Sequence, residues 1–390
     1  MCADQTDQEP ITAFDEIPRE GQDPASHLIG QFDYLNASGR PEAAAVRELI
    51  DAWLVDYPAA HRPDLIRRLR SRADMSHRSA MFELMLHALL LRQGFTIVEI
   101  EPQLPNGKAP DFLVEAPDGR RFYLEATLAS GIDNVAAGAD RRMREALQAI
   151  DDVRSPDFFL HLHTRGTPNQ PIATARLRRA VQRFVDELDY DQAVVTAEAG
   201  QPPAPVWQYA EHGAHFMIQP VPKNIRRREG RAIGGRMLPG GVITPEVAIK
   251  SAVEGKAGRY GDIGLPLVIA VNALEEFARE GDAVDALFGT TGVIVSEDGA
   301  ARGMRNRDGA WCGPGGPVYT RSSAVLFVAR FSAWSVGQRS ISLILNPWAR
   351  NPIAGLPLGV EVREAVDGRL KTEPGQPLRE IFGLPEGWPE

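Results

Sequence analysis

The pattern of hydrophobic and polar positions predicts a chain in which helices and strands alternate. Segments 41–57 and 63–72 are predicted to be helices, each with proline at its start, where a missing N–H is tolerated. Segment 77–93 is apolar on every side, as expected of a buried helix, and it ends at Gly94, a suitable C-terminal cap. Further helical patterns lie near 139–153, at 173–188 and at 245–258.

Strands are predicted where short apolar runs lie between turn residues. The runs are 95–101, the two arms of a hairpin that turns at 117–119, 156–164, two arms around 206–220, 265–272, 323–331 and 340–346. We expect the last two runs to form an antiparallel pair. Alternating strands and helices predict an α/β fold with a mixed sheet.

The predicted divisions follow the changes in composition. Residues 1–25 carry seven acids and one base, which account for six of the nine net negative charges, so the start of the chain is expected to be disordered. The divisions are an acidic tail (1–38), a helical segment (39–75), a core (76–190), an α/β extension that packs on or completes the core (206–350) and a Pro/Gly-rich tail (351–390) that wraps or frays.

Composition narrows the class of protein. A hydrophobic content of 43% is ample for a sizeable core. The two cysteines, Cys2 and Cys312, form no disulfide framework, and no apolar run approaches the roughly 18 residues of a membrane span. We therefore expect a soluble cytoplasmic protein with no membrane partner. P-loop, GxGxxG, GxSxG and HExxH motifs are absent from the sequence, which disfavours nucleotide-driven enzymes, elbow-type hydrolases and zinc peptidases.

Two carboxylates are predicted to face each other across the first hairpin. The turn APDGR has proline and glycine where a three-residue hairpin loop needs them. If Ala116 and Arg120 close this loop, Asp111 falls opposite Glu125, although a one-residue bulge would shift the register. Opposed residues have Cβ atoms roughly 5 Å apart, where like charges are destabilising. A divalent cation is the simplest partner that makes such a pair favourable.

A third carboxylate lies within the apolar helix 77–93. Glu83 is surrounded by apolar residues, and a buried charge needs a partner. His87, one turn later, is one candidate partner. The alternative is that Glu83 points toward the same cation as the hairpin pair.

These motifs resemble those of the PD-(D/E)XK, or restriction-endonuclease-like, nuclease superfamily. Pro110-Asp111 matches the first half of the motif, and Glu125-Ala126-Thr127 matches the second, with Thr127 in place of the usual lysine. Glu83 matches an acidic residue that many members carry on the first helix. The resemblance covers about residues 76–165 and implies an α-β-β-β-α-β core with a mixed sheet, to which further α/β and β-hairpin elements are added. Either 156–164 or 265–272 could supply the last core strand.

The resemblance implies a divalent-metal-dependent phosphodiesterase acting on nucleic acid, with DNA expected rather than RNA. Asp111, Glu125 and the carbonyl of Ala126 would hold Mg²⁺ (or Mn²⁺), Glu83 would complete the metal shell, and Thr127 could hydrogen-bond a metal-bound water. An endonuclease of restriction, repair or bacterial defence type is the expected setting. The sequence leaves the oligomeric state open, with a homodimer as one option.

The missing motif lysine raises the question of which cation replaces it. Lys256 is our first choice, because it borders the apolar stripe of helix 245–258; Lys108 and Lys250 follow. The alternatives are that Lys256 extends to solvent and that Lys108 belongs to an ordinary NGK turn.

One segment is densely basic and interleaved with glycines, a composition that suits phosphate contacts. Its candidate nucleic-acid-binding residues are Lys223, Arg226, Arg227, Arg228, Arg231 and Arg236. A solvated loop is the alternative.

Two rival readings remain open. The first is an inactive restriction-like module that binds nucleic acid or protein, which Thr127 favours. The second is a structural α/β protein whose carboxylates pair with Arg120, Arg121 and His87.

Overall fold

The chain forms two compact units. The computed structural model describes residues 11–130, 134–199, 205–227, 230–237, 244–275, 277–295 and 301–390. Unit 1 comprises the described residues of 1–23, 30–131 and 243–390, and unit 2 those of 24–29 and 132–242. Unit 2 therefore interrupts unit 1 in sequence, and the core expected over 76–190 is divided between the two units.

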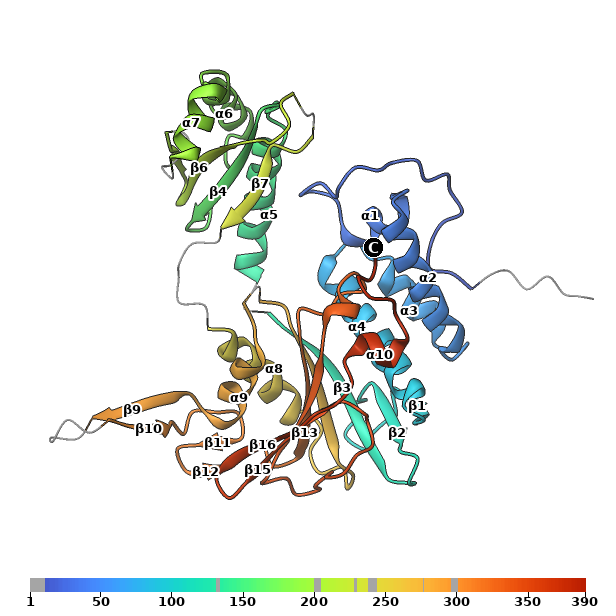
Figure 1. Cartoon of the computed structure of the whole chain (residues 1–390). Helices are drawn as coiled ribbons and strands as arrows, with labels where there is room; N and C mark the ends of the chain where they lie inside the picture. Colours follow the sequence, from blue (N-terminus) through green and yellow to red (C-terminus); the bar gives the residue numbers. More distant parts are fainter. Residues whose placement is uncertain are drawn as a thin grey trace, which may run out of the picture. The chain divides into compact units, whose positions relative to one another are not determined.

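Unit 1 contains an eight-stranded mixed sheet (Figure 1). In spatial order its strands are β1 (Thr96–Ile100), β2 (Phe112–Glu115), β3 (Arg121–Ala129), β8 (Leu267–Ala273), β13 (Ser322–Ala329), β14 (Ile341–Leu345), β15 (Glu361–Val366) and β16 (Arg369–Glu373). Strands β1 to β3 are antiparallel, β3 pairs in parallel with β8, and β8 pairs in parallel with β13. β8 rather than segment 156–164 thus pairs with the hairpin. The predicted antiparallel pair of β13 and β14 is confirmed.

Helices cover both faces of this sheet. The helices of unit 1 are α1 (Gln31–Ala37), α2 (Pro41–Asp56), α3 (Arg62–Leu69), α4 (Asp74–Arg92), α8 (Pro245–Ala257), α9 (Glu280–Phe288), the 3₁₀ turn η1 (Val336–Gln338) and α10 (Leu378–Phe382). Val268 and Ala270 of β8 pack in one core cluster with α4, while Ile269 and Val271 pack in another with α8 and α9. Burial on both faces explains why β8 is a continuous apolar run.

The remaining strands of unit 1 form two small hairpins. They are β9 (Thr291–Val295) with β10 (Ala301–Arg305) and β11 (Cys312–Gly313) with β12 (Gly316–Pro317). Among the described helices of the whole chain, none combines the length and apolar character needed to cross a membrane.

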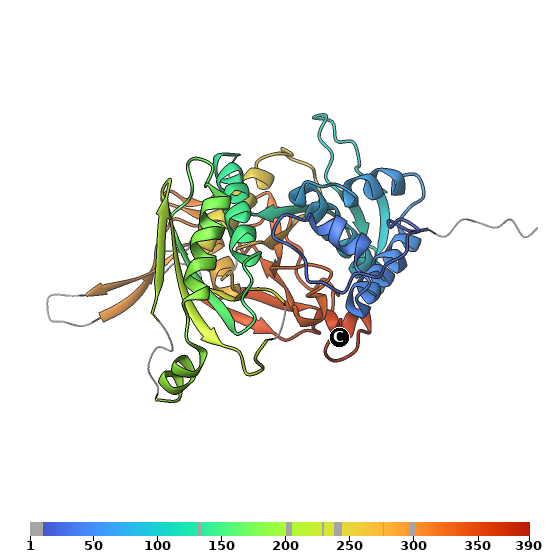
Figure 2. The ribbon, with the colours of Figure 1, turned by 90° about the horizontal axis from the view of Figure 1, so that it is seen from above.

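Unit 2 is a small α/β unit with its own core. Its four-stranded sheet has the order β5 (Trp207–Glu211), β6 (Ala214–Pro222), β4 (Phe158–Arg165) and β7 (Ile233–Met237). Its helices are α5 (Asn134–Asp151), α6 (Thr174–Asp186) and α7 (Tyr190–Glu198). Figure 2 shows α5 and α6 side by side against the strands, and apolar residues of both helices share one cluster with β4 and β6.

Residues 11–38 and 351–390 are more ordered than the sequence suggests. Residues 1–10 lie outside the described residues, but 11–38 are not a disordered tail. Phe14 stacks on Phe32 with ring centroids 5.8 Å apart, and Thr12 and the Ala13 N–H bind Asp51. Segment 351–390 likewise adds β15, β16 and α10 to the fold, and Phe382 lies 4.9 Å from Trp53 between ring centroids. Scattered apolar residues therefore outweigh the acidic or Pro/Gly-rich composition at both ends.

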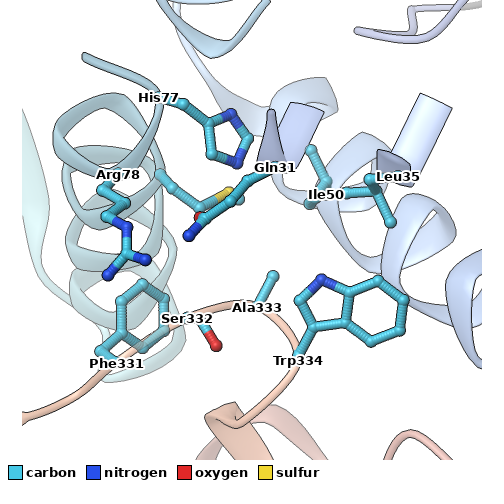
Figure 3. A pocket seen from close by; sticks show the side chains of 10 residues that line it. Gln31, Leu35, Ile50, His77, Arg78, Phe331, Ser332, Ala333 and Trp334 are labelled. Atoms are coloured by element: carbon cyan, nitrogen blue, oxygen red, sulfur yellow. The ribbon is translucent and has the colours of Figure 1, made fainter. Parts of the chain in front are cut away.

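A small cavity of about 20 Å³ lies between α1, α2, α4 and the segment after β13 (Figure 3). His77, Arg78 and Trp334 are among its lining residues. This volume is close to that of a single water molecule, so the cavity is too small for a substrate.

Candidate carboxylate site

The hairpin that carries the motif forms as its turn residues predict. The Ala116 N–H donates to the Arg120 carbonyl at 2.8 Å, and Gly119 has a φ of 83°, a conformation that glycine adopts without strain. The paired residues include Val114 with Phe122 and Phe112 with Leu124, without a bulge between them. The predicted register is therefore confirmed up to the pair that precedes Asp111 and Glu125.

Asp111 sits where the ladder between β2 and β3 ends. Its Oδ2 accepts a hydrogen bond from the Ala126 N–H at 2.6 Å, and its backbone carbonyl accepts one from Glu101 at 2.9 Å. Alternation along each strand places Phe112 and Leu124 on the α4 face, so Asp111 and Glu125 both face α8. The hairpin thus brings both carboxylates to one side of the sheet.

Helix α8 and the residues that follow it supply cations to Glu125. The Lys256 Nζ lies 2.5 Å from Glu125 Oε1, and a guanidinium nitrogen of Arg259 lies 3.7 Å from the same oxygen. Burial and a hydrogen bond to Glu125 raise the pKa of the Tyr260 hydroxyl. Lys256 lies in the last turn of α8, and Arg259 and Tyr260 follow in the turn after the helix ends at Ala257. The prediction that Lys256 reaches the carboxylate site is confirmed for Glu125.

Lys108 and Lys250 have other surroundings. Lys250 pairs with Glu254 at 3.9 Å, one turn along α8. The Lys108 N–H donates to Asn106 Oδ1, which is the turn chemistry that an NGK sequence predicts. Lys256 is therefore the lysine that the structure places in the candidate site.

Among the described residues, one oxygen of the carboxylate pair lacks a hydrogen-bond partner, and the pKa of the second carboxyl group is raised. Glu125 is only 2% exposed, and its Oε2 has no hydrogen-bond partner among the described residues. Burial, then the charges of Glu125 and Glu83, raises the pKa of Asp111 to about 8, although the Ala126 N–H and Lys256 oppose this shift. An orphaned buried carboxylate oxygen beside a second carboxylate suits an added cation.

The donor set fits a hard divalent ion. Asp111, Glu125 and the Ala126 carbonyl offer oxygen atoms, which Mg²⁺ and Mn²⁺ prefer. Within the part of the chain that the structure describes, no group of three His, Cys, Asp or Glu side chains is arranged to hold a metal. A metal at this site would therefore rest on two carboxylates, the peptide oxygen and water. Thr127 follows on β3, two residues from Glu125 and on the same strand face.

Glu83 has a separate set of partners. Its Oε2 and Oε1 accept hydrogen bonds from Arg68 at 2.6 and 2.9 Å, and Oε1 also accepts one from the Tyr57 hydroxyl at 2.7 Å. The suggested pairing with His87 is wrong, because Arg68 and Tyr57 occupy both oxygens of Glu83. Glu83 is still near enough to Asp111 for its charge to raise the pKa of that residue.

His87 is buried among rings instead. Its centroid lies 4.8 Å from that of Tyr57, and burial lowers the pKa of His87 to about 4. The alternative partners Arg120 and Arg121 pair with Asp118 and Glu115 on the hairpin. The hypothesis of a purely structural protein, in which Arg120, Arg121 and His87 pair with the site carboxylates, is therefore not supported by these contacts.

The basic segment belongs to unit 2, and its side chains differ in exposure and in their partners. The prediction that Lys223 contacts nucleic acid is wrong. Its side chain is only 3% exposed, and its Nζ donates to the Ser155 carbonyl at 2.8 Å, so it is not a surface cation. Arg231 pairs with Asp151 at 2.9 Å. Arg226 and Arg227 are exposed, and Arg226 also stacks over the Tyr190 ring at 4.4 Å.

Two further predicted phosphate contacts are Arg228 and Arg236. Arg228 lies outside the described residues. Arg236 belongs to strand β7. Arg226 and Arg227 are thus the members of the segment that the structure shows to be exposed.

Arg68, Tyr57 and Arg259 were missed by sequence reasoning. Arg259 lies directly after the predicted helix 245–258, three residues beyond Lys256, so its closeness to Lys256 in sequence was a usable signal. Arg68 and Tyr57 approach Glu83 from separate helical segments, and no spacing in the sequence indicates that approach. Comparison of the chain with protein-family models, curated proteins and solved structures finds no match.

Proposed function

We propose that unit 1 is a divalent-metal-dependent phosphodiesterase that cuts nucleic acid, DNA in the first instance. The observation that carries this proposal is the contact of Lys256 with Glu125 at 2.5 Å, beside Asp111, while the other Glu125 oxygen has no partner among the described residues. In this proposal, Lys256 would supply the positive charge that Thr127 cannot. This combination of carboxylates and ammonium is the chemistry that phosphodiester cleavage needs.

The order of elements supports a restriction-endonuclease-like core. Helix α4, the strands β1, β2 and β3, helix α8 and strand β8 follow one another in the required α-β-β-β-α-β order, with β8 parallel to β3. In this proposal unit 2 is an insertion between β3 and α8.

Asp111, Glu125 and the Ala126 carbonyl would hold Mg²⁺ or Mn²⁺. A bound ion supplies activation of water and neutralisation of the charge that develops on the scissile phosphate. Asp111, whose pKa is about 8 in the protein alone, would ionise as it gains a cation. Its Ala126 hydrogen bond holds the carboxylate in place for that role.

Lys256 and Arg259 would act on the phosphate and water. Lys256 is three-quarters buried, so its ammonium is held by α8 rather than left to sample solvent. The Lys256 ammonium would stabilise the transition-state charge or orient the attacking water. The more exposed Arg259 can contact an adjacent phosphate. Arg226 and Arg227 of unit 2 would add sequence-independent phosphate contacts.

The experiment that tests this function compares two lysines of one helix. We expect Lys256→Ala to lower the rate of Mg²⁺-dependent DNA cleavage about 10²–10³-fold, as loss of a transition-state donor does. Lys250→Ala is the matched control, because Lys250 pairs with Glu254 and not with Glu125. Equal activity of the two variants would exclude the role of Lys256.

A non-cutting nucleic-acid binder is the second candidate. It is favoured by the two cations that contact Glu125 and by Thr127 at the motif position. Affinity for DNA with a steep salt dependence and no cleavage products in Mg²⁺ or Mn²⁺ would establish this candidate instead.

A further inference from the structure

A second concave site opens in unit 1, on segments that the carboxylate site does not use. It has a volume of about 470 Å³ and is lined by the end of α9, the segment after β10, Cys312, the loop after β14 and the turn between β15 and β16. Figure 1 labels α9, β10, β11, β15 and β16, which belong to this part of unit 1. The volume lies within the roughly 300–1,000 Å³ that is typical of small-molecule sites.

The charge of this pocket is positive. Arg305, Arg307 and Arg369 are among its lining residues, and none of the described lining residues is acidic. Arg305 is held at 2.8 Å by Asp285 and at 2.5 Å by the Gly289 carbonyl, so it is fixed in position. Arg307 and Arg369 are exposed, and within the described ranges no carboxylate forms an ion pair with either of them. Two guanidinium groups are therefore available to an anion.

The pocket also presents aromatic surface. Phe288 and Trp348 line it with ring centroids 6.1 Å apart, and Trp348 is 36% exposed. Phe288 packs edge-on against Trp311, which is fully buried and donates from its indole N–H to Ser322 at 2.8 Å. The aromatic wall is thus backed by a rigid part of the core. Stacking on an exposed indole is favourable for every nucleobase.

We propose that this pocket binds a nucleotide, with its base against Trp348 and its phosphate between Arg307 and Arg369. Arginine forks match phosphate oxygens, and an aromatic face matches a base, so the pocket pairs both parts of one nucleotide. The proposal goes beyond the phosphodiesterase activity, because binding here does not require Asp111 or Glu125. A free mononucleotide and one nucleotide of a longer strand share this chemistry.

Cys312 provides a direct readout of occupancy. It lines the pocket and is a partly exposed free thiol. In a Cys2→Ser background, the rate of Cys312 alkylation by iodoacetamide reports whether the pocket is filled. We expect dAMP or a short single-stranded oligonucleotide to slow alkylation in a saturable way, whereas inorganic phosphate and adenosine alone give weaker protection.

Substitutions show whether the protection of Cys312 depends on the pocket residues, on a neighbouring arginine or on the carboxylate site. Arg307→Ala, Arg369→Ala and Trp348→Leu are each expected to weaken protection about tenfold. Arg350→Ala is the matched control, since this exposed arginine near Trp348 bonds Thr320 and does not line the pocket. In the Asp111→Ala variant, dAMP should protect Cys312 from alkylation as well as it does in the unmutated protein. A failure of the phosphodiesterase proposal therefore leaves this test intact.

The two nucleotide sources and the failure of the proposal give different results. Protection by dAMP indicates a free nucleotide, and protection by the oligonucleotide alone indicates a nucleotide of a strand. Absence of protection by both would overturn the proposal. So would equal protection by inorganic phosphate, or equal weakening by Arg350→Ala, because either result describes a general anion effect.

Discussion

At the scale of residues, the candidate site is a pair of carboxyl groups on the α8 side of the sheet, and one of their oxygens has no hydrogen-bond partner among the described residues. Glu125 has Lys256 and Arg259 on one oxygen and no described partner on the other. Asp111 has one backbone donor and a raised pKa. The sequence could predict that these two carboxylates share a face, because strand alternation and turn chemistry determine it. It could not predict which oxygen the cations contact, since that depends on the packing of α8 against the sheet.

The raised pKa of Asp111 makes a prediction about pH in the absence of metal. The folded protein holds this proton up to about pH 8, whereas an unfolded Asp releases it near 3.8. The contribution of Asp111 to stability is therefore fully present below pH 3.8 and is lost as pH rises through 8. We expect Asp111→Asn to be more stable than the unmodified protein at about pH 9 in EDTA, with little difference near pH 4. Urea unfolding at both values measures this, and a variant no more stable than the unmodified protein at the higher pH would contradict it.

At the scale of elements, long and strongly patterned segments were predictable, but their partners were not. Helix α4 and strand β8 lie within a few residues of the predicted ranges, because uniform apolarity requires burial on all sides. The short helices α7 and α9 were not predicted, and neither were β15 and β16, whose residues are mostly exposed. Their stability comes from tertiary contacts that no local pattern records.

The bidentate pair between Arg68 on α3 and Glu83 on α4 tests one such contact. We expect Arg68→Ala to destabilise unit 1 by about 3–5 kcal/mol, since it leaves the Glu83 charge buried with only the Tyr57 hydroxyl. The double variant Arg68→Met with Glu83→Met should recover most of that loss. Denaturant unfolding of the two variants measures the difference. Equal stability of the single and double variants would show that the pair is not coupled.

Two glycines, Gly119 in the hairpin turn and Gly255 in helix α8, should respond in opposite ways to substitution by alanine. Gly119 has a φ of 83°, whereas Gly255 lies inside α8, and an added Cβ meets nothing within 4 Å at either position. We expect Gly119→Ala to destabilise by about 1 kcal/mol and Gly255→Ala to stabilise by about 0.5–1 kcal/mol. Thermal melting compares them. The same sign of change at both positions would contradict the turn assignment.

At the scale of the whole molecule, the chain is an α/β protein whose main sheet is interrupted in sequence by a second unit. Segment 156–164 is a good strand, and the sequence therefore offered it as a core strand beside 265–272. Only pairing distinguishes the two, because both are apolar and both follow a helix. The structure assigns β4 to unit 2 and β8 to the sheet that carries Asp111 and Glu125. Long-range pairing of this kind is set by the whole fold and not by local composition.

The central claim is that the carboxylate site hydrolyses DNA with a divalent ion, and one cleavage assay tests it most directly. Supercoiled plasmid and end-labelled linear DNA are incubated with the unmodified protein and with Asp111→Asn, in Mg²⁺, in Mn²⁺ and in EDTA. This substitution preserves the size of the side chain but removes the charge that would bind the ion, so folding is retained. We expect metal-dependent products from the unmodified protein alone, and none from the variant or in EDTA. Products that form equally with the variant, or none with either metal at any protein concentration, would contradict the claim.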